Sequence, residues 1–202
     1  MPQHGNGSRR EAPALSETKP RHAVFLDRDG TVAEDVGYLN HLSRFHLYPY
    51  SAAAIGRLNA ANVPVVIVTN QAGVARCYFP EALVQHVNER MIAELAAQGA
   101  RVNAVYYCPH SSEDGCACRK PLPGMLERAA REHQLEVRGS WVVGDRCGDM
   151  ELAFAAGCRS ILVLSGYGRG EYEWHHASWG RQPEFIVENL QDAVEIILKE
   201  LR

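Results

Sequence analysis

A short apolar run that ends in two acids constrains this chain more than any other stretch. Residues 22–26 read His-Ala-Val-Phe-Leu, and Asp27, Asp29 and Gly30 follow within a few positions. Such a run is typical of a buried parallel strand, and a glycine behind it allows a tight turn. Ligands of open α/β sheets bind at the carboxyl ends of the strands, so both carboxylates would lie where a site forms. Their mutual repulsion favours a bound cation, and oxygen ligands suit Mg²⁺; the alternative is an ordinary acidic turn that caps the strand.

The length and charge of the chain limit the classes of protein to which it can belong. Its 202 residues suffice for one domain with a full core, and 46% hydrophobic with 22% charged residues is a soluble globular balance. The formal net charge of -3 argues against nucleic acid or an anionic membrane as a partner. We expect a cytoplasmic protein, because no segment reads as a signal peptide or approaches the ~18 apolar residues of a membrane span. In that compartment, six cysteines favour metal binding or free thiols over disulfides.

Strand-like and helix-like stretches alternate from residue 21 to the end of the chain. Strands are expected at 22–26, 64–70, 102–107, 141–145, 161–164 and 185–187, and helices at 51–61, 80–98, 125–133, 149–157 and 190–201. This alternation predicts an α/β fold, with helices on both faces of a Rossmann-like parallel sheet. We expect a single domain over residues 21–202 after a disordered N-terminal tail over residues 1–20. The glycines of residues 166–170 predict a flexible loop, either as a rim of the site or as a plain connection.

Polar side chains lie at the ends of four of the expected strands or follow them. They are Asp27 and Asp29, Thr69 and Asn70, Arg119 and Lys120 after a loop, and Asp145. In a parallel sheet these groups would converge on one edge. Acids that hold a cation, basic groups that hold an anion and a hydroxyl between them describe a phosphoryl-transfer site. There, one aspartate can attack phosphorus, and a second can protonate the leaving oxygen and then activate water.

These four segments, in this order, resemble the four motifs of the haloacid-dehalogenase-like phosphatases. The resemblance covers almost all of residues 22–200 and implies the fold described above. It implies that Asp27 is the nucleophile and that Asp29 is the general acid/base. It further implies that Thr69 binds the phosphoryl oxygens and that Lys120 steadies the charge around the nucleophile.

The same resemblance implies a magnesium site. Mg²⁺ would be held by Asp27, by the backbone carbonyl of Asp29 and by Asp145, while Asp149 would support that site or cap its helix. The intervals from Asp27 to Thr69 and from Thr69 to Lys120 leave no room for an obvious cap domain. We therefore expect a capless enzyme whose open site depends on loops for selectivity.

A compact loop at residues 108–118 carries a second set of candidate ligands. They are Cys108, His110, Cys116 and Cys118. Three thiolates and one imidazole satisfy the tetrahedral preference of Zn²⁺ and leave no position open for substrate, so the site would be structural. The alternative is four unrelated reduced side chains in a loop. Because this loop ends at Arg119 and Lys120, zinc would set the position of both cations.

A Cys-x-His and Cys-x-Cys-Arg-Lys-Pro loop in this fold resembles the D-glycero-D-manno-heptose 1,7-bisphosphate 7-phosphatases, and the phosphatase domain of histidinol-phosphate phosphatase is similar. The resemblance implies substrate contacts from Asp35, Tyr38, Thr69, Asn70, Gln71, Arg76, Arg119 and Lys120. A second phosphate on the substrate would explain an arginine beside the catalytic lysine. Two departures are Ala72, where the family usually has serine, and Cys77, where it usually has glycine. Either could alter the preference for a sugar.

The expected function is hydrolysis of the C7 phosphate of D-glycero-D-manno-heptose 1,7-bisphosphate through an aspartyl-phosphate, in nucleotide-heptose biosynthesis. The expected cofactors are Mg²⁺ and Zn²⁺, and the expected partner is a small phosphorylated sugar bound by a monomer. One alternative is a histidinol-phosphate phosphatase or another small phosphomonoesterase. A non-enzyme alternative is a zinc-loop binding module that has lost catalysis, against which the intact acids Asp27, Asp29 and Asp145 count.

Overall fold

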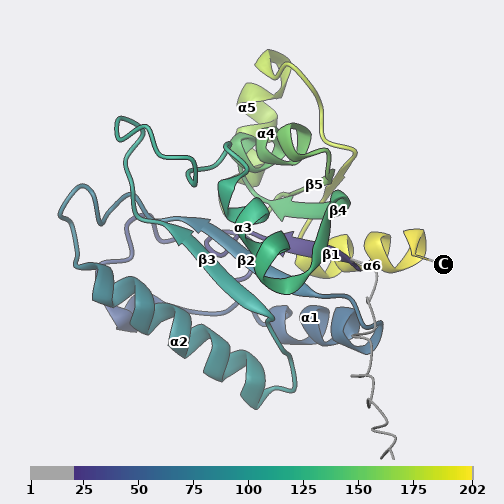
Figure 1. The fold of residues 1–202 in the computed structure, drawn as a ribbon, viewed down its shortest axis with the longest axis horizontal. Helices are drawn as coiled ribbons and strands as arrows, with labels where there is room; N and C mark the ends of the chain where they lie inside the picture. Colours follow the sequence, from purple (N-terminus) through teal and green to yellow (C-terminus); the bar gives the residue numbers. More distant parts are fainter. Residues whose placement is uncertain (1–20, 202) are drawn as a thin grey trace, which may run out of the picture.

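Six parallel strands form the central sheet of the fold (Figure 1). The computed structural model describes residues 21–201, so the tail expected over residues 1–20 lies outside the described residues. The strands are β1 Arg21–Leu26, β2 Val65–Asn70, β3 Ala104–Cys108, β4 Leu135–Gly144, β5 Arg159–Val163 and β6 Phe185–Val187. Their order is β3-β2-β1-β4-β5-β6 with parallel pairing between neighbours, which confirms the predicted class.

The strand β1 lies at the point where the winding of the chain changes direction. It pairs with β2 on one side and with β4 on the other, and Phe25 is in register with both Val66 and Val142. From β1 the chain winds outward to β2 and β3, and later through β4 and β5 to β6. Open α/β sheets bind ligands at such a switch point, outside the carboxyl ends of the strands. Asp27 directly follows β1 there, and Asp145 directly follows β4.

Helices cover both faces of the sheet (Figure 1). The helices α1 Ser51–Ala60, α2 Glu81–Ala97 and α6 Leu190–Glu200 pack on one face, and α3 Gly124–His133 and α4 Cys147–Ala156 on the other. Successive residues of β1 enter the two cores in turn: Val24 and Leu26 pack in the first, Ala23 and Phe25 in the second. Burial on both faces is the reason that this strand reads as a continuous apolar run.

Two segments differ from the expectation. The strand β4 begins at Leu135, well before residue 141, and its early part pairs with Arg21 and His22 before the register shifts. The sequence does not reveal this early part as a strand. It contains polar residues, and Gly139, with φ +81°, interrupts the period-two alternation of a strand. The prediction of a flexible loop at residues 166–170 is wrong, because α5 Gly168–His175 begins within this segment. Gly168 is required there by close packing, because a Cβ would overlap the carbonyl group of Val163.

Short connections stand where a cap domain could be inserted. Residues 27–50 contain one 3-10 turn, η1 Leu42–Arg44, and residues 109–123 contain no helix or strand. A second 3-10 turn, η2 His176–Ser178, follows α5. The fold therefore agrees with the expected capless architecture. Within residues 21–201, no helix combines the length and the apolar character that a membrane crossing requires.

Candidate active site

One cavity at the carboxyl edge of the sheet collects most of the predicted site residues. Its volume is 460 Å³. The predicted residues that line it are Asp27, Asp29, Asp35, Tyr38, Thr69, Asn70, Gln71, Arg119 and Lys120. Asp145 is fully buried and lies against Asp27. Gly30, with φ +86°, turns the chain shortly after Asp27. A Cβ at this position would overlap the Asp145 carboxylate.

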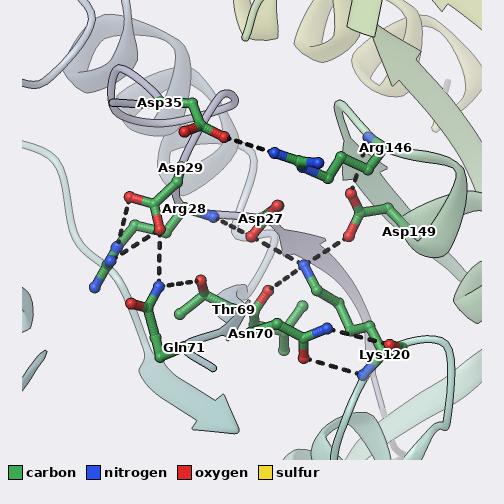
Figure 2. Close-up of polar contacts among 11 residues, drawn as sticks. Asp27, Arg28, Asp29, Asp35, Thr69, Asn70, Gln71, Lys120, Arg146 and Asp149 are labelled. Atoms are coloured by element: carbon green, nitrogen blue, oxygen red, sulfur yellow. Dashed lines mark hydrogen bonds and ion pairs between the residues drawn. The ribbon is translucent and has the colours of Figure 1, made fainter. Parts of the chain in front are cut away.

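Lys120 connects the candidate nucleophile to a second acid (Figure 2). Its Nζ lies 2.9 Å from Oδ1 of Asp27 and 2.6 Å from Oδ1 of Asp149, and it donates to the carbonyl oxygen of Val68 at 3.0 Å. Burial lowers the pKa of Lys120, but the carboxylates of Asp149 and Asp27 outweigh that effect and raise the pKa above its ordinary value. The lysine is therefore a permanent cation beside Asp27.

Three carboxylates form a buried acidic cluster. Ligand atoms of Asp27, Asp145 and Asp149 all lie within 4.8 Å of one another. Burial, with the neighbouring acids, raises the pKa of Asp27 to about 7 and that of Asp145 to about 8. Oδ1 of Asp145 has no hydrogen-bond partner within residues 21–201, although it is buried. A buried carboxylate oxygen without a partner fits a divalent cation, so this cluster could hold Mg²⁺.

The carboxylate of Asp29 is held by other partners than Lys120, and in the view of Figure 2 Asp27 and Thr69 lie between the two residues. Arg28 donates to both of its oxygens, from Nε to Oδ1 at 3.1 Å and from Nη2 to Oδ2 at 2.8 Å. Gln71 donates to Oδ2 at 2.8 Å and to the Thr69 hydroxyl at 2.9 Å, so the acid and the hydroxyl share a partner. The sequence reasoning missed Arg28, and the signal was its position between two acids after a buried strand.

The four predicted zinc ligands converge in the loop after β3. The Sγ atom of Cys118 lies 3.2 Å from that of Cys108, 3.5 Å from that of Cys116 and 3.3 Å from Nδ1 of His110. A tetrahedral site with Zn–S bonds of about 2.3 Å separates its sulfurs by roughly 3.8 Å. The spacing and the donor set are compatible with a bound metal ion, so this cluster could hold Zn²⁺.

The same loop is tied to the active-site cations. Arg119 donates from Nη1 to the carbonyl oxygen of His110 at 3.2 Å. Asn70 receives a hydrogen bond from the backbone nitrogen of Lys120 at 3.0 Å and donates to its carbonyl oxygen at 3.1 Å. A metal in this loop would therefore fix the chain from which both cations project, with Asn70 as a second anchor.

The predicted substrate-contacting arginine Arg76 lies outside the cavity lining, and Arg146 takes part instead. Arg76 is exposed, with its guanidinium 6.0 Å from the centre of the Tyr38 ring. Arg146 lines the cavity, donates to Asp35 at 3.2 Å and stacks at 3.8 Å over the ring of Tyr167. Arg146 was missed, although its place directly after Asp145 was a usable signal.

The two departures from the resembled family lie at and beside the cavity. Ala72 lines the cavity, so the serine that the family usually has at this position would place its hydroxyl at the site. Cys77 is exposed and adopts φ 56°, in the left-handed region that glycine tolerates best. The backbone thus keeps the conformation that a glycine would favour, and the loop is retained with a strained residue in place.

Comparisons with known proteins extend these observations. Residues 117–193 match a family model described as HAD-hydrolase-like. The D-glycero-D-manno-heptose-1,7-bisphosphate 7-phosphatase of Thermosynechococcus vestitus is 42% identical over 197 residues, which cover 90% of this chain and 98% of that protein. The D-glycero-beta-D-manno-heptose-1,7-bisphosphate 7-phosphatase of Pseudomonas putida is 41% identical over 151 residues, 74% of this chain and 86% of its own length.

A solved structure shares the fold at a similar level of identity. It is the D,D-heptose 1,7-bisphosphate phosphatase of B. bronchiseptica complexed with magnesium and phosphate, with a TM-score of 0.80 and 38% identity. The match covers 89% of this chain and 99% of that one. The chain therefore belongs to the D-glycero-D-manno-heptose-1,7-bisphosphate 7-phosphatase family of haloacid-dehalogenase-like hydrolases.

Proposed function

We propose that this protein is a Mg²⁺-dependent phosphatase that removes the C7 phosphate of D-glycero-D-manno-heptose 1,7-bisphosphate. The observation that carries the proposal is the contact of 2.9 Å between Nζ of Lys120 and Oδ1 of Asp27. A permanent cation beside a buried carboxylate at a strand end prepares that carboxylate to meet a phosphate. Relatives with 41–42% identity carry this activity in their names.

In the proposed reaction, an oxygen of Asp27 attacks the phosphorus of the C7 phosphate. The bond from phosphorus to the sugar oxygen breaks, and Asp29 gives its proton to that oxygen. The Asp29 carboxylate then takes a proton from water, whose oxygen attacks the phosphorus of the aspartyl-phosphate. Inorganic phosphate leaves and Asp27 is restored. Thr69 and Lys120, which line the cavity, bind the phosphoryl oxygens.

Two metals complete the proposal. Asp27, the backbone carbonyl of Asp29 and Asp145 would hold Mg²⁺, which neutralises phosphoryl charge when it is bound. The unpartnered Oδ1 of Asp145 supports this assignment. Cys108, His110, Cys116 and Cys118 would hold a structural Zn²⁺, as their interatomic distances support.

The second phosphate of the substrate and its sugar would be bound by other groups that line the cavity. Arg119 and Arg146 are its guanidinium groups, and Asp35, Tyr38, Asn70 and Gln71 supply the remaining polar contacts. Arg76 would contact the substrate from beside the cavity, because its guanidinium lies 6.0 Å from the centre of the ring of Tyr38, which lines the cavity. We also propose that residues 21–202 form one phosphatase domain, which acts as a monomer in the cytoplasm.

A substrate panel tests this proposal. Phosphate release with Mg²⁺ is measured for both anomers of heptose 1,7-bisphosphate, fructose 1,6-bisphosphate, histidinol phosphate and an aryl phosphate. We expect kcat/KM for one heptose anomer to exceed that for the other substrates by about a hundredfold. A preference for histidinol phosphate would contradict the proposal, and equal slow turnover of every compound would contradict the assigned substrate.

A further inference from the structure

We propose that Arg28 and Asn88 are positioning residues that fix the carboxylate of Asp29 for proton transfer. The inference rests on the proposed function, because it assigns a task to the general acid of that reaction. Neither residue lines the cavity, so both would act through Asp29.

Arg28 forms a bidentate ion pair with Asp29. Its side chain is 1% exposed, and its Nε and Nη2 atoms donate to the two oxygens of Asp29 at 3.1 and 2.8 Å. Two parallel hydrogen bonds from a rigid guanidinium fix both the direction and the plane of a carboxylate. A lysine at this position could make only a point contact.

Asn88 braces the guanidinium from helix α2. Its Oδ1 accepts from Nη1 of Arg28 at 2.9 Å, across 60 positions of sequence. Asn88 is 7% exposed and lies on the buried face of the helix, which is otherwise apolar: Val84, Val87, Met91 and Leu95. A buried polar side chain on such a face needs a partner, and here the partner is the arginine that holds the acid.

The donors around Asp29 also leave its two oxygens in different surroundings. Oδ2 accepts from Arg28 and Gln71, which fill the two lone-pair positions of a carboxyl oxygen. Oδ1 accepts one hydrogen bond among the described residues. Oδ1 therefore keeps a lone-pair position that none of the described residues fills, whereas both positions of Oδ2 are taken.

Stability alone does not account for this arrangement. A buried guanidinium pays a large desolvation penalty, and replacing a buried ion pair by apolar side chains is often neutral or stabilising. Asp29, the acid of this pair, lines the cavity, whereas Asn88, which holds the arginine, is buried in the core. The position of the pair at the site gives it a catalytic rather than a structural rationale.

The dependence of the rate on the leaving group tests the inference. A general acid matters most when a poor leaving group, such as a sugar alcohol, must be protonated, and least when a good one, such as nitrophenolate, departs. We would measure kcat/KM of Asn88→Leu and Arg28→Lys on alkyl and aryl phosphates of graded leaving-group acidity. Met91→Ala, on the same buried helix face, serves as the control for general destabilisation.

We expect Asn88→Leu to lower kcat/KM about tenfold or more for alkyl phosphates and less than about threefold for nitrophenyl phosphate. The slope of log kcat/KM against the pKa of the leaving group should therefore steepen. Mg²⁺ affinity by calorimetry should be unchanged. Met91→Ala should leave the slope as it is. Equal losses on all substrates, or none, would overturn the inference. The series contains no heptose, so the inference can be judged even if the assigned sugar is wrong.

Discussion

The Nζ atom of Lys120 lies 2.6 Å from Oδ1 of Asp149, a residue in the first turn of α4. The other oxygen of Asp149 accepts from the backbone nitrogen of Arg146 at 3.1 Å and so caps α4. A Cβ at Gly144 would overlap this carboxylate, so the strand end is shaped around it. Asp149 thus joins the loop after β4 to the cation beside the nucleophile, and it also caps its helix, one of the two roles expected for it from the sequence.

Replacing Asp149 by asparagine should weaken both the fold and the reaction. The amide oxygen can still cap α4, but Lys120 loses a charged partner in a buried place. We expect the free energy of unfolding to fall by about 1–3 kcal/mol, together with a lower kcat, measured by urea denaturation and phosphate release. Glu151→Gln, an exposed change on the same helix, should alter neither quantity. Unchanged stability and turnover in Asp149→Asn would contradict this account of Lys120.

Removing one ligand of the cysteine–histidine loop should disturb the cations beyond it. Because Arg119 is tied to His110, loss of the metal should loosen the chain that carries Lys120. We expect Cys118→Ser to bind less than about half an equivalent of zinc, to unfold at lower temperature and to lose about tenfold in kcat/KM. Cys77→Ser, at an exposed cysteine outside the loop, should retain the metal. Full activity of zinc-free protein would refute the link.

The acidic cluster predicts a pH-dependent stability that Mg²⁺ suppresses. Burial raises the pKa of Asp27 to about 7 and that of Asp145 to about 8, against an ordinary value of 3.8. The folded state then binds protons that the unfolded state has released, so without a divalent cation stability should fall as pH rises from about 4 to 8. Mg²⁺ should compete with these protons, and its affinity should increase over the same range.

Calorimetry in buffers of different ionisation enthalpy would detect the protons released when Mg²⁺ binds. Asp145→Asn removes one of the titrating groups and should reduce both the proton release and the slope of stability with pH. If the slope is the same with and without Mg²⁺, the cluster does not bind the cation.

Cys77→Gly should stabilise the protein. A non-glycine residue with φ 56° carries a strain of about 1–2 kcal/mol, which glycine removes, although glycine adds entropy to the unfolded chain. We expect a net gain of up to about 1 kcal/mol in urea denaturation. Cys77→Ala retains the Cβ and should give no such gain, and a loss of stability in Cys77→Gly would show that the thiol contributes more than the strain costs.

The parts of the fold that could be predicted from sequence are those with a local signal. Apolar runs such as Ala23–Leu26 identified the inner strands, and polar residues at their ends located the site. The helix α5 could not be predicted, because its glycines are typical of a loop. The close packing of Gly168 against β5, which requires a glycine, leaves no signal in the sequence. Arg146 and Asn88 were also missed. Arg146 follows Asp145 directly in the sequence, but its partner Asp35, like Arg28 as the partner of Asn88, is brought near only in the folded chain.

The most direct test of the account follows heptose 1,7-bisphosphate by phosphorus NMR with the wild-type protein and Asp27→Asn, both loaded with Mg²⁺ and zinc. We predict that the wild-type protein removes the C7 phosphate and leaves the C1 phosphate in place. Asp27→Asn, with an unchanged fold and zinc content, should release no phosphate. Turnover by Asp27→Asn, or loss of the C1 phosphate in the wild-type reaction, would contradict the account.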